Sequence, residues 1–298
     1  MLSILIPTYN HSVFSLVKEL QHQASTNNIS YEIIVMDDAS RDKKIIDENL
    51  QVNNIDNCSY LVQSENQGRT ATRQHLALRA RFDNLLFLDA DVIPKYPDFI
   101  QRFQYHEQEW DIQFGGIAYK PEAPPTSETL RWKYGKARET LSVSERKNDP
   151  YQTINSGAFL IKKALFLEIN EQLKFNMYGL DNLFKQLLEK KNAKVVHLDN
   201  PVFHLGLENS VTFIKKAKEA VKTTVDLEQE GLIENNRRPL QKAYIKLKKF
   251  GLLRTFITIA KQFNKRILRN LNSKNPSLLL FDLYRLHYYS ELKSQKNA

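Results

Sequence analysis

Apolar runs and helix-spaced patterns alternate along the first part of the chain. Strand-length apolar segments that end in polar residues lie within residues 2–9, 31–40, 59–66 and 84–92. Residues 13–23 and 68–82 instead place their apolar side chains at helical spacing. Strands that are apolar on both faces are typical of a parallel sheet covered by helices on both sides. This part of the chain therefore predicts an α/β fold.

The pattern loosens after Pro94. We expect further elements in this order: a strand in 111–119, a loop in 120–128, a helix in 129–143, strand, turn and helix in 154–169, a helix in 180–191, and a last strand with a trailing loop in 193–206. The pair Gly115 and Gly116 predicts a bulge or a close approach of two backbones. From there on the chain reads as helical, so we divide it into an α/β domain over 1–205 and a basic amphipathic helical extension over 206–298.

Charge is distributed unevenly along the 298 residues. From Arg237 to the end there are 15 Lys and Arg against two acids, so this tail carries +13 while the whole chain carries +9. The first 236 residues are therefore mildly acidic, at −4. Such asymmetry indicates an anionic surface as a partner.

The tail segments 239–271 and 276–292 combine helix-spaced apolar residues with many cations. This composition is typical of helices that lie in a membrane interface, and the aromatic residues of the second segment suit the headgroup boundary. The alternative is that the helices pack on the α/β domain and expose a solvated basic face. No RNA- or DNA-binding module is recognisable, so we expect no nucleic-acid partner.

The opening residues, the length of the apolar runs and the cysteine content favour a cytoplasmic protein. The opening residues read as a strand and not as a signal peptide, and no apolar run reaches the roughly 20 residues of a spanning helix. Cys58, the single cysteine, suits a reducing compartment. We expect a cytoplasmic protein that is soluble or peripheral at the inner face of the plasma membrane.

Polar residues gather where three predicted strands end. The clusters are Thr8-Tyr9-Asn10, Asp37-Asp38 and Asp89-Ala90-Asp91. In open parallel sheets, ligands bind at the carboxyl ends of the strands. A single pair of acids is commonly a solvated turn or a cap, but three clusters at successive strand ends indicate a site. Asp89 and Asp91 would face one side of an extended strand, where a divalent cation would offset their repulsion.

Six segments in this order resemble family 2 glycosyltransferases with the GT-A fold. They are "ILIPTYN", "EIIVMDDAS", "ENQGRTATRQHLA", "LFLDADV", "INSGAFLIKKALF" and "YGLDNLF". The likeness covers about residues 1–205. It implies a Rossmann-like, mostly parallel sheet with helices on both faces, followed here by the C-terminal helical extension.

The resemblance gives roles to the first two clusters. Pro7, Thr8 and Tyr9 match the opening segment of the nucleotide-sugar site, and Tyr9 matches the residue that stacks on uracil. An aromatic platform suits a flat heterocycle, although a buried core tyrosine is the alternative. Asp38 matches the carboxylate that accepts a hydrogen bond from uracil N3–H. Asp37 reads equally well as an acid of the turn.

Residues that follow the third strand match an N-x-G-x-x-x-x-R pattern of the family. Asn66, Gly68 and Arg73 occupy its defined positions. Gly68 would let the backbone approach a ligand, and the helix start beyond it suits an anion. Arg73 would pair with the diphosphate or with acids of the site, whereas Arg69 reads as solvated.

The third cluster matches the metal motif of the family. Asp91 would bind Mg²⁺ or Mn²⁺ directly. Asp89 would be a second candidate metal ligand and, with Ala90, would hold the sugar or ribose of the donor. His204 lies where some relatives place a further metal or phosphate ligand, although a histidine near a strand end is commonly structural. The cation would carry negative charge that builds on the departing nucleoside diphosphate.

The last two segments supply the reacting side of the site. Asn155, Ser156 and Gly157 match the segment that lines the sugar and acceptor region. Asp181 matches the carboxylate that removes the acceptor proton, although the usual Glu before it is Leu180 here. An Asp at a helix start is also a common cap, which is the structural alternative.

Together these matches imply a metal-dependent, inverting hexosyl- or N-acetylhexosaminyltransferase. It would move a sugar from a UDP-sugar to a hydroxyl of a glycan or lipid-linked saccharide in cell-surface polysaccharide synthesis. A non-catalytic domain that binds a nucleotide-sugar or tethers partners at a membrane is the alternative. A sugar-nucleotide pyrophosphorylase would need a glycine-rich loop after the first strand, and "PTYNHSVFS" contains no glycine.

Overall fold

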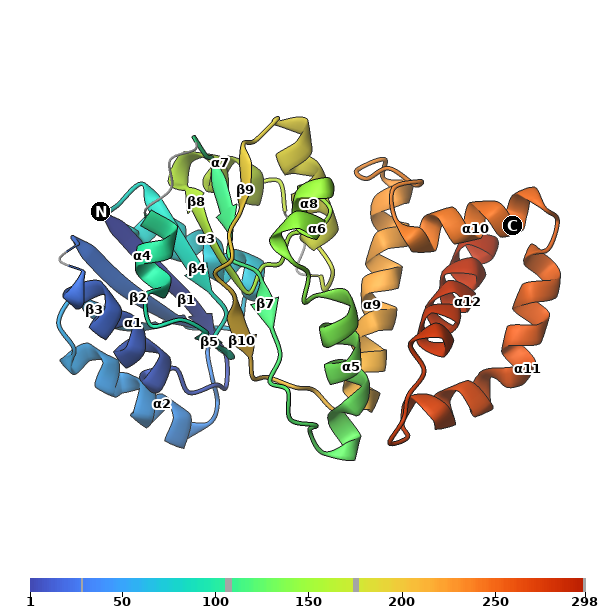
Figure 1. The fold of residues 1–298 in the computed structure, drawn as a ribbon, viewed down its shortest axis with the longest axis horizontal. Coiled ribbons are helices and arrows are strands. Elements are labelled where there is room, and N and C mark those ends of the chain that lie inside the picture. The colour runs from blue at the N-terminus through green and yellow to red at the C-terminus, as the bar shows by residue number, and fades with distance from the viewer. Residues whose placement is uncertain (28, 105–108, 174–176, 297–298) are drawn as a thin grey trace. The chain divides into compact units, whose positions relative to one another are not determined.

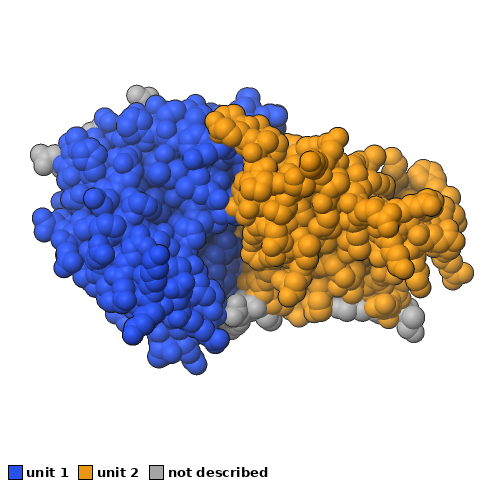
Figure 2. Space-filling view, turned by 90° about the horizontal axis from the view of Figure 1, so that it is seen from below, with its two compact units in different colours: residues 1–120, 139–176, 184–206 blue, residues 121–138, 177–183, 207–298 orange. Residues whose placement is uncertain are grey.

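The structure, a computed structural model, describes all residues except 28, 105–108, 174–176 and 297–298 (Figure 1). It divides into two compact units, which are coloured in Figure 2. Unit 1 comprises residues 1–120, 139–176 and 184–206, and unit 2 comprises 121–138, 177–183 and 207–298. We predicted two contiguous domains, 1–205 and 206–298, whereas unit 2 also includes two segments that precede residue 205.

Unit 1 is built on a seven-stranded sheet with the order β3-β2-β1-β4-β8-β6-β9. Its strands are β1 Leu2–Thr8, β2 Tyr31–Asp37, β3 Cys58–Val62, β4 Asn84–Leu88, β6 Ile112–Phe114, β8 Ala158–Lys162 and β9 Val195–His197. β1 pairs in parallel with β2 and β4, and β8 runs antiparallel to β4 and β6. The predicted α/β fold with a mostly parallel sheet is therefore confirmed.

Helices cover both faces of this sheet. They are α1 Phe14–Thr26, α2 Lys43–Leu50, α3 Arg69–Arg79, α4 Phe99–Gln104, α6 Val143–Asn148, α7 Lys163–Asn170 and α8 Asp181–Lys190, with a 3₁₀ turn at Gln51–Asn54. Leu86 of β4 packs in one core with residues of α1 and α4. The next residue, Phe87, points to the opposite face and lies 4.5 Å from Phe166 of α7, measured between ring centroids.

The segment 84–92, predicted as one strand, is two strands joined by a turn. β4 ends at Leu88, and β5 Val92–Pro94 belongs to a second sheet with β10 Val202–His204 and β7 Ile117–Ala118. Asp89 and Asp91 therefore lie in the connecting turn and not on an extended strand. The prediction that both face one side of a strand is wrong for that reason.

Two other predicted strands are divided in the same way. The strand expected in 111–119 is β6 and β7, which are separated at Gly115 and Gly116. A Cβ on Gly115 would lie 2.1 Å from the Asn200 carbonyl oxygen, so this pair marks a close backbone approach, as predicted. The last strand expected in 193–206 is β9 and β10.

The helix predicted over 129–143 also ends early. α5 is Thr129–Arg138, and a separate helix, α6, begins after Ser142. Ser142 and Glu145 form a reciprocal capping box there. The helix α2 was not predicted, although the Asp42 side chain caps it by accepting from the backbone N–H groups of Lys44 and Ile45.

Unit 2 is helical. Besides α5 and a 3₁₀ turn at Thr126–Glu128, its helices are α9 Ser210–Gln229, α10 Pro239–Lys249, α11 Leu253–Leu271 and α12 Leu278–Lys296. α12 contacts α9 and α11 and is apolar on several sides, as a central helix must be. Within the described part of the chain, no helix combines the length and the apolar character that a membrane crossing requires.

Aromatic residues of α12 form part of the core of unit 2. Phe281 and Tyr289 are fully buried in it, so the headgroup-boundary role suggested for this segment is wrong for these two residues. Tyr289 and Lys293 both donate to the buried carboxylate of Glu228, at 2.8 Å each to Oε2. Burial of the Glu228 carboxylate is thus matched by hydrogen bonds.

We predict that acidification destabilises unit 1 through His197. Its Nε2–H donates to the Pro150 carbonyl at 2.9 Å, and its Nδ1 accepts from Arg146 at 3.2 Å. Burial, followed by the Arg146 charge, holds the pKa of His197 below its usual value of 6.5. The unfolded chain therefore binds the proton more readily, and stability falls as the pH drops below that value, by about 1.4 kcal/mol for each unit of pKa depression.

Urea unfolding at about pH 7.5 and 5.5 checks this expectation. His197→Asn keeps an acceptor toward Arg146 but cannot titrate, so its stability should change less between the two pH values. His22→Asn replaces an exposed histidine and serves as the control. An equal pH dependence in the wild type and the His197→Asn variant would contradict the prediction.

Candidate active site

The strand ends at the centre of the sheet bring the three predicted clusters to one edge. Thr8, the last residue of β1, pairs with Asp37, the last residue of β2, and the Asp38 N–H donates to the Thr8 carbonyl at 2.9 Å. Asp89 follows β4, the other neighbour of β1. These polar residues therefore line one edge of the sheet, as predicted.

The carboxylate of Asp38 is buried and held by the loop that follows β3. Its Oδ1 accepts from the Gln67 backbone N–H and from the Gln63 side-chain amide, both at 2.7 Å. Its Oδ2 accepts from the Gly68 backbone N–H at 2.8 Å. A carboxylate can accept about four hydrogen bonds, so Oδ2 keeps the capacity to accept one from a ligand.

Asp37 has a structural role. It is fully buried, accepts from the Ser40 backbone N–H at 2.7 Å, and accepts from the Tyr60 hydroxyl. Burial, together with this hydrogen bond, raises the pKa of Tyr60, so the phenol stays protonated and can donate. The reading of Asp37 as an acid of the turn is the one that agrees with these contacts.

Tyr9 is 46% exposed at the end of β1, so the alternative of a buried core tyrosine is wrong. The turn behind it is held by Asn10, which has a φ of 48° and accepts from the Arg41 backbone N–H at 2.9 Å. Thr8 uses its hydroxyl to donate to the His11 carbonyl, and Pro7 is partly exposed within β1. Of the three predicted residues of this segment, only Tyr9 presents a large exposed side chain.

Two residues that the sequence did not single out support Asp38: Gln63, in the loop between β3 and α3, and His75, within α3. Gln63 donates to Asp38 and accepts at its Oε1 from Nδ1 of His75, at 2.7 Å. This chain of contacts fixes the orientation of the Gln63 amide. Asn66 donates to the Asp38 carbonyl, and Gly68, with a φ of 84°, turns the chain into α3. Gln63 and His75 follow no local pattern, so only the fold reveals them.

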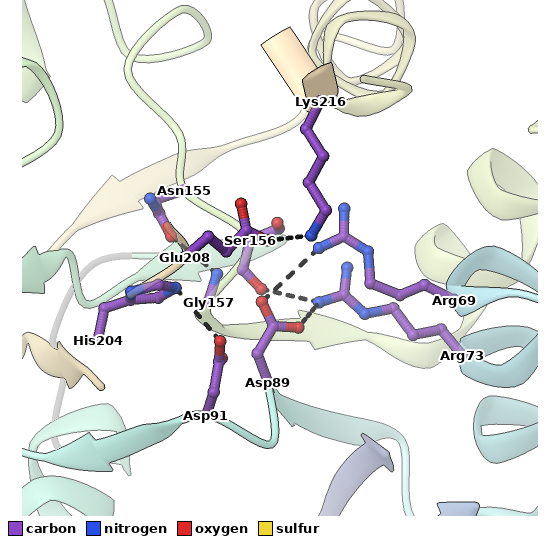
Figure 3. A network of polar contacts seen from close by, with 10 residues as sticks. All are labelled: Arg69, Arg73, Asp89, Asp91, Asn155, Ser156, Gly157, His204, Glu208 and Lys216. Carbon is purple, nitrogen blue, oxygen red and sulfur yellow. Dashed lines mark hydrogen bonds and ion pairs between the residues drawn. The ribbon is translucent and has the colours of Figure 1, made fainter. Parts of the chain in front are cut away.

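Arg73 and Asp89 form the central ion pair of the site. One guanidinium nitrogen of Arg73 lies 2.6 Å from Asp89 Oδ1 and also donates to the Ser156 carbonyl at 2.9 Å (Figure 3). Arg69, predicted to be solvated, lies 3.7 Å from Asp89 Oδ2. Both oxygens of Asp89 therefore face positive charge supplied by α3.

The segment 155–157 connects this ion pair to β8. The Asn155 side chain accepts from the Gly157 N–H at 2.8 Å, and the Gly157 carbonyl accepts from the Asp89 N–H at 2.9 Å. The Ser156 carbonyl accepts from Arg73. The predicted sugar and acceptor segment thus touches Asp89 and Arg73 directly, while Ala90 occupies the turn beyond them.

Asp91 faces a different partner. Its Oδ2 lies 3.4 Å from Nε2 of His204, which β10 brings to it (Figure 3). The Leu205 N–H donates to the Asp91 carbonyl at 2.8 Å. A Cβ on Gly206 would lie 2.1 Å from Asp91 Oδ2, so only glycine leaves room for this carboxylate. Tyr119 packs against the His204 ring at 5.6 Å between centroids.

The donor set at Asp91 suits a divalent cation. Carboxylate and imidazole are ligands of Mn²⁺, and carboxylate is a ligand of Mg²⁺. Gly206 provides a cradle in which no side chain competes for the space beside Asp91. Within the residues that the structure describes, no three His, Cys, Asp or Glu side chains gather as a metal-binding group. Within this described part of the chain, Asp91 and His204 form a pair of candidate ligands and not a complete cage.

Asp181 belongs to unit 2 and is the first residue of α8. Gly179, with a φ of 97°, precedes it and packs closely on Ala220, since an added Cβ would lie 3.0 Å from the Ala220 Cα. Leu180, which stands where the family usually has Glu, is buried. The negative charge of Asp181 acts on the buried guanidinium of Arg238 within the same unit, although burial is the main cause that lowers the pKa of Arg238.

Comparison with known proteins places these residues in a family. The sequence pattern of glycosyl transferase family 2 matches residues 3–168. The chain is also 34% identical over 115 residues to dolichyl-phosphate beta-glucosyltransferase of Drosophila melanogaster, a match that covers 33% of this chain and 33% of that protein. The chain thus aligns with about a third of the length of that curated relative.

Solved structures share the fold at low identity. A mannosyltransferase from Pyrobaculum calidifontis, solved with GDP-Man and Mn²⁺, matches with a TM-score of 0.57 and 14% identity over 99% of this chain and 86% of that one. Mannosyl-3-phosphoglycerate synthase from Rubrobacter xylanophilus matches with a TM-score of 0.54 and 16% identity over 80% and 77%. With the family pattern matching more than half of its residues, the chain belongs to glycosyl transferase family 2 and has the GT-A fold.

Proposed function

We propose that this protein is a metal-dependent, inverting glycosyltransferase and that it uses a UDP-sugar. The acceptor would be a hydroxyl of a glycan or a lipid-linked saccharide in cell-surface polysaccharide synthesis. The observation that carries the proposal is the division between the two acids of the β4–β5 turn. Asp89 is neutralised by Arg69 and Arg73, whereas Asp91 faces His204 beside the Gly206 cradle.

Asp91 and His204 would hold Mg²⁺ or Mn²⁺, which when bound would neutralise charge on the departing nucleoside diphosphate. Asp89, whose oxygens already contact two guanidinium groups, is assigned to the donor sugar and to positioning of Arg73. Arg69 is the more exposed of the two arginines, so its guanidinium can turn toward a diphosphate while Arg73 stays with Asp89.

The nucleotide base would lie between Tyr9 and Asp38. The exposed ring of Tyr9 supplies a stacking surface. The remaining acceptor position of Asp38 requires a hydrogen-bond donor on the base, which the ring N3–H of uracil supplies. Cytosine has an acceptor at that ring position and would face the carboxylate unfavourably, which supports uridine over cytidine.

Asp181 is proposed as the general base. Its carboxylate would take the proton of the acceptor hydroxyl as that oxygen bonds to the anomeric carbon and the bond from this carbon to the diphosphate oxygen breaks. Attack from the face opposite the leaving UDP inverts the anomeric configuration. A non-catalytic nucleotide-sugar-binding or membrane-tethering domain is the competing proposal, and it predicts binding without turnover.

We also propose that the protein works in the cytoplasm, peripherally at the inner face of the plasma membrane. The net charge of +13 from Arg237 onward supports a negatively charged surface as its partner. A lipid-linked acceptor would be available at the same surface.

Mutation of the metal pair should weaken nucleotide binding only when the cation is present. Asp91→Asn removes a charged ligand, and Gly206→Ala places a methyl group where Asp91 Oδ2 lies. We expect UDP affinity in Mn²⁺ to fall by roughly 10- to 100-fold in both variants, and chelation with EDTA should remove the difference from wild type. Isothermal titration calorimetry measures both conditions.

Asp47→Asn, on the exposed side of α2, is the control for this experiment, because it makes the same chemical change away from the site. It should bind UDP in Mn²⁺ as the wild type does. Unchanged UDP affinity in Asp91→Asn with Mn²⁺ present would refute the proposed metal pair.

Base selectivity should depend on Asp38. We expect Asp38→Asn to weaken UDP binding by about 10- to 100-fold, because a hydrogen bond to a charged acceptor is lost, and to reduce the preference for UDP over CDP. Gln63→Leu should also weaken UDP binding and reduce the preference for UDP over CDP, but by less. It removes one of the three contacts that orient the Asp38 carboxylate. Asp47→Asn, on the exposed side of α2, is the matched control. A UDP/CDP ratio that stays at the wild-type value in Asp38→Asn would exclude this role.

Removal of the proposed base should slow turnover without weakening donor binding. We expect Asp181→Asn to lower kcat by roughly 10²- to 10⁴-fold with the UDP-sugar Kd unchanged. The donor is the UDP-sugar with the largest thermal shift in Mn²⁺, and release of UDP is the readout. Glu189→Gln, on the same helix, should keep wild-type turnover. Equal kcat for Asp181→Asn and the wild type would reject Asp181 as the base.

A further inference from the structure

The helices of the basic tail differ in how much of their surface is buried. α12 is buried at the centre of unit 2, and α10 contributes the buried side chains of Gln241 and Tyr244. α11 differs, because only Ala260, Ile267 and Leu271 of its 19 residues are buried. Its apolar side chains therefore need a separate explanation.

One stripe of α11 is apolar and exposed. Leu252, which immediately precedes the helix, is 52% exposed, Ile259 is 51% exposed and Phe263 is 44% exposed. Their spacing of seven and four residues places them on one side of the helix. Phe250, on the other side of Gly251 in the α10–α11 turn, is exposed as well. We call Phe250, Leu252, Ile259 and Phe263 the α11 face.

This face is not the stripe that covers the core. On a helical wheel, the buried residues Ala260, Ile267 and Leu271 lie to one side of the α11 face, toward α12. The apolar arc of α11 is thus wider than the part that packing on α12 covers. A helix that only covered a core would carry polar residues on its exposed side.

The surroundings of the α11 face carry one sign of charge. Between residues 239 and 271 there are nine Lys and Arg and no Asp or Glu. Arg254, Lys261, Lys265, Arg266 and Arg269 of α11 are all exposed. On the helical wheel Arg266 lies directly beside the α11 face, and the other four cations lie farther around the exposed side of the helix. An exposed apolar stripe on a helix that carries charges of one sign only is complementary to a surface that is apolar below and anionic above.

A second copy of this chain is a poor occupant by the same criterion. Two α11 faces brought together would also bring together eighteen cations without an acid from either segment. Nucleic acid would satisfy the cations, but it offers nothing to an aliphatic stripe such as Leu252 and Ile259. The charges and the apolar side chains together favour a lipid bilayer.

We propose that the α11 face docks the protein on an anionic membrane surface. Phe250, Leu252, Ile259 and Phe263 would enter the boundary between headgroups and acyl chains, and Arg266 would contact anionic headgroups. The other Lys and Arg of α11 would be attracted to the same headgroups from a greater distance. The α12 aromatics take no part. This docking does not depend on the donor, the metal or the base proposed above, and it narrows the membrane contact from the whole tail to one helix face.

Vesicle flotation with the full chain tests the proposal. The vesicles are phosphatidylcholine alone or phosphatidylcholine with about a quarter phosphatidylglycerol. We expect binding to the anionic vesicles that falls with added salt, and little binding to the neutral ones. Ile259→Ser with Phe263→Ser should lower the partition coefficient at least about tenfold, because two half-exposed apolar side chains no longer enter the bilayer.

Matched variants distinguish docking through the α11 face from non-specific binding to vesicles. Leu78→Ser removes an exposed leucine from α3 of unit 1 and should leave binding unchanged. Lys261→Glu with Lys265→Glu should weaken binding to anionic vesicles, whereas Lys43→Glu with Lys44→Glu on α2 should weaken it much less. Every substituted side chain is exposed, so we expect all the variants to fold. Circular dichroism and UDP binding check this expectation.

Three results would overturn the proposal. The first is binding to anionic vesicles that persists in the Ile259→Ser/Phe263→Ser variant, which would mean that charge alone drives it. The second is self-association of the wild type, measured by analytical ultracentrifugation, that the same variant abolishes, which would make a second copy the occupant. The third is a duplex RNA probe that binds the wild type but not Lys261→Glu/Lys265→Glu, with no vesicle binding by either. A failure of UDP binding leaves all three results readable.

Discussion

The site depends on one buried cation. The Arg73 side chain is almost completely buried in unit 1 and stacks near the rings of Phe87 and Phe159. A buried charge without a partner costs several kcal/mol, so the guanidinium must keep its contacts with Asp89 and the Ser156 carbonyl. These contacts join α3, the end of β4 and the segment before β8. The position of the turn that carries Asp91 follows from this junction.

The ion pair also explains how two acids tolerate each other at one strand end. Arg69 and Arg73 compensate Asp89 through α3, and His204 faces Asp91 from β10. The turn at residue 90 sends the two carboxylates to different partners, where an extended strand would have held them side by side. Repulsion is thereby removed before any cation binds. Asp91 is left as the acid with the weaker internal partner and the glycine cradle, which is the arrangement expected of a ligand and not of a structural carboxylate.

The sequence predicted the strands of the sheet and the residues at their ends, because both depend on local patterns. Apolar runs mark β1, β2 and β4, and the acids that follow them need no knowledge of distant contacts. The apolar Val92 and Ile93 hid the turn after β4, since an apolar run does not reveal that its last residues join another sheet. Gln63, His75 and Gly206 act only through residues far along the chain, so no spacing rule could have indicated them.

The basic tail shows most clearly that sequence patterns do not reveal which apolar side chains become buried. Periodicity identified the amphipathic helices, but it could not say which apolar stripe another helix covers. The aromatic residues of α12 resemble a membrane boundary in sequence and are core residues in the structure, because α9 and α11 enclose them. Phe263 and Ile267 are both apolar and lie one turn apart on α11, yet the first is exposed and the second is buried. Leu252, Ile259 and Phe263 belong to neither of the two core clusters described in unit 2, and about half of each side chain is exposed. Exposing these apolar side chains to water is unfavourable, and the proposed contact with a partner outside the fold explains why they are there. Because residues 239–271 contain no acid, that partner is expected to be negatively charged.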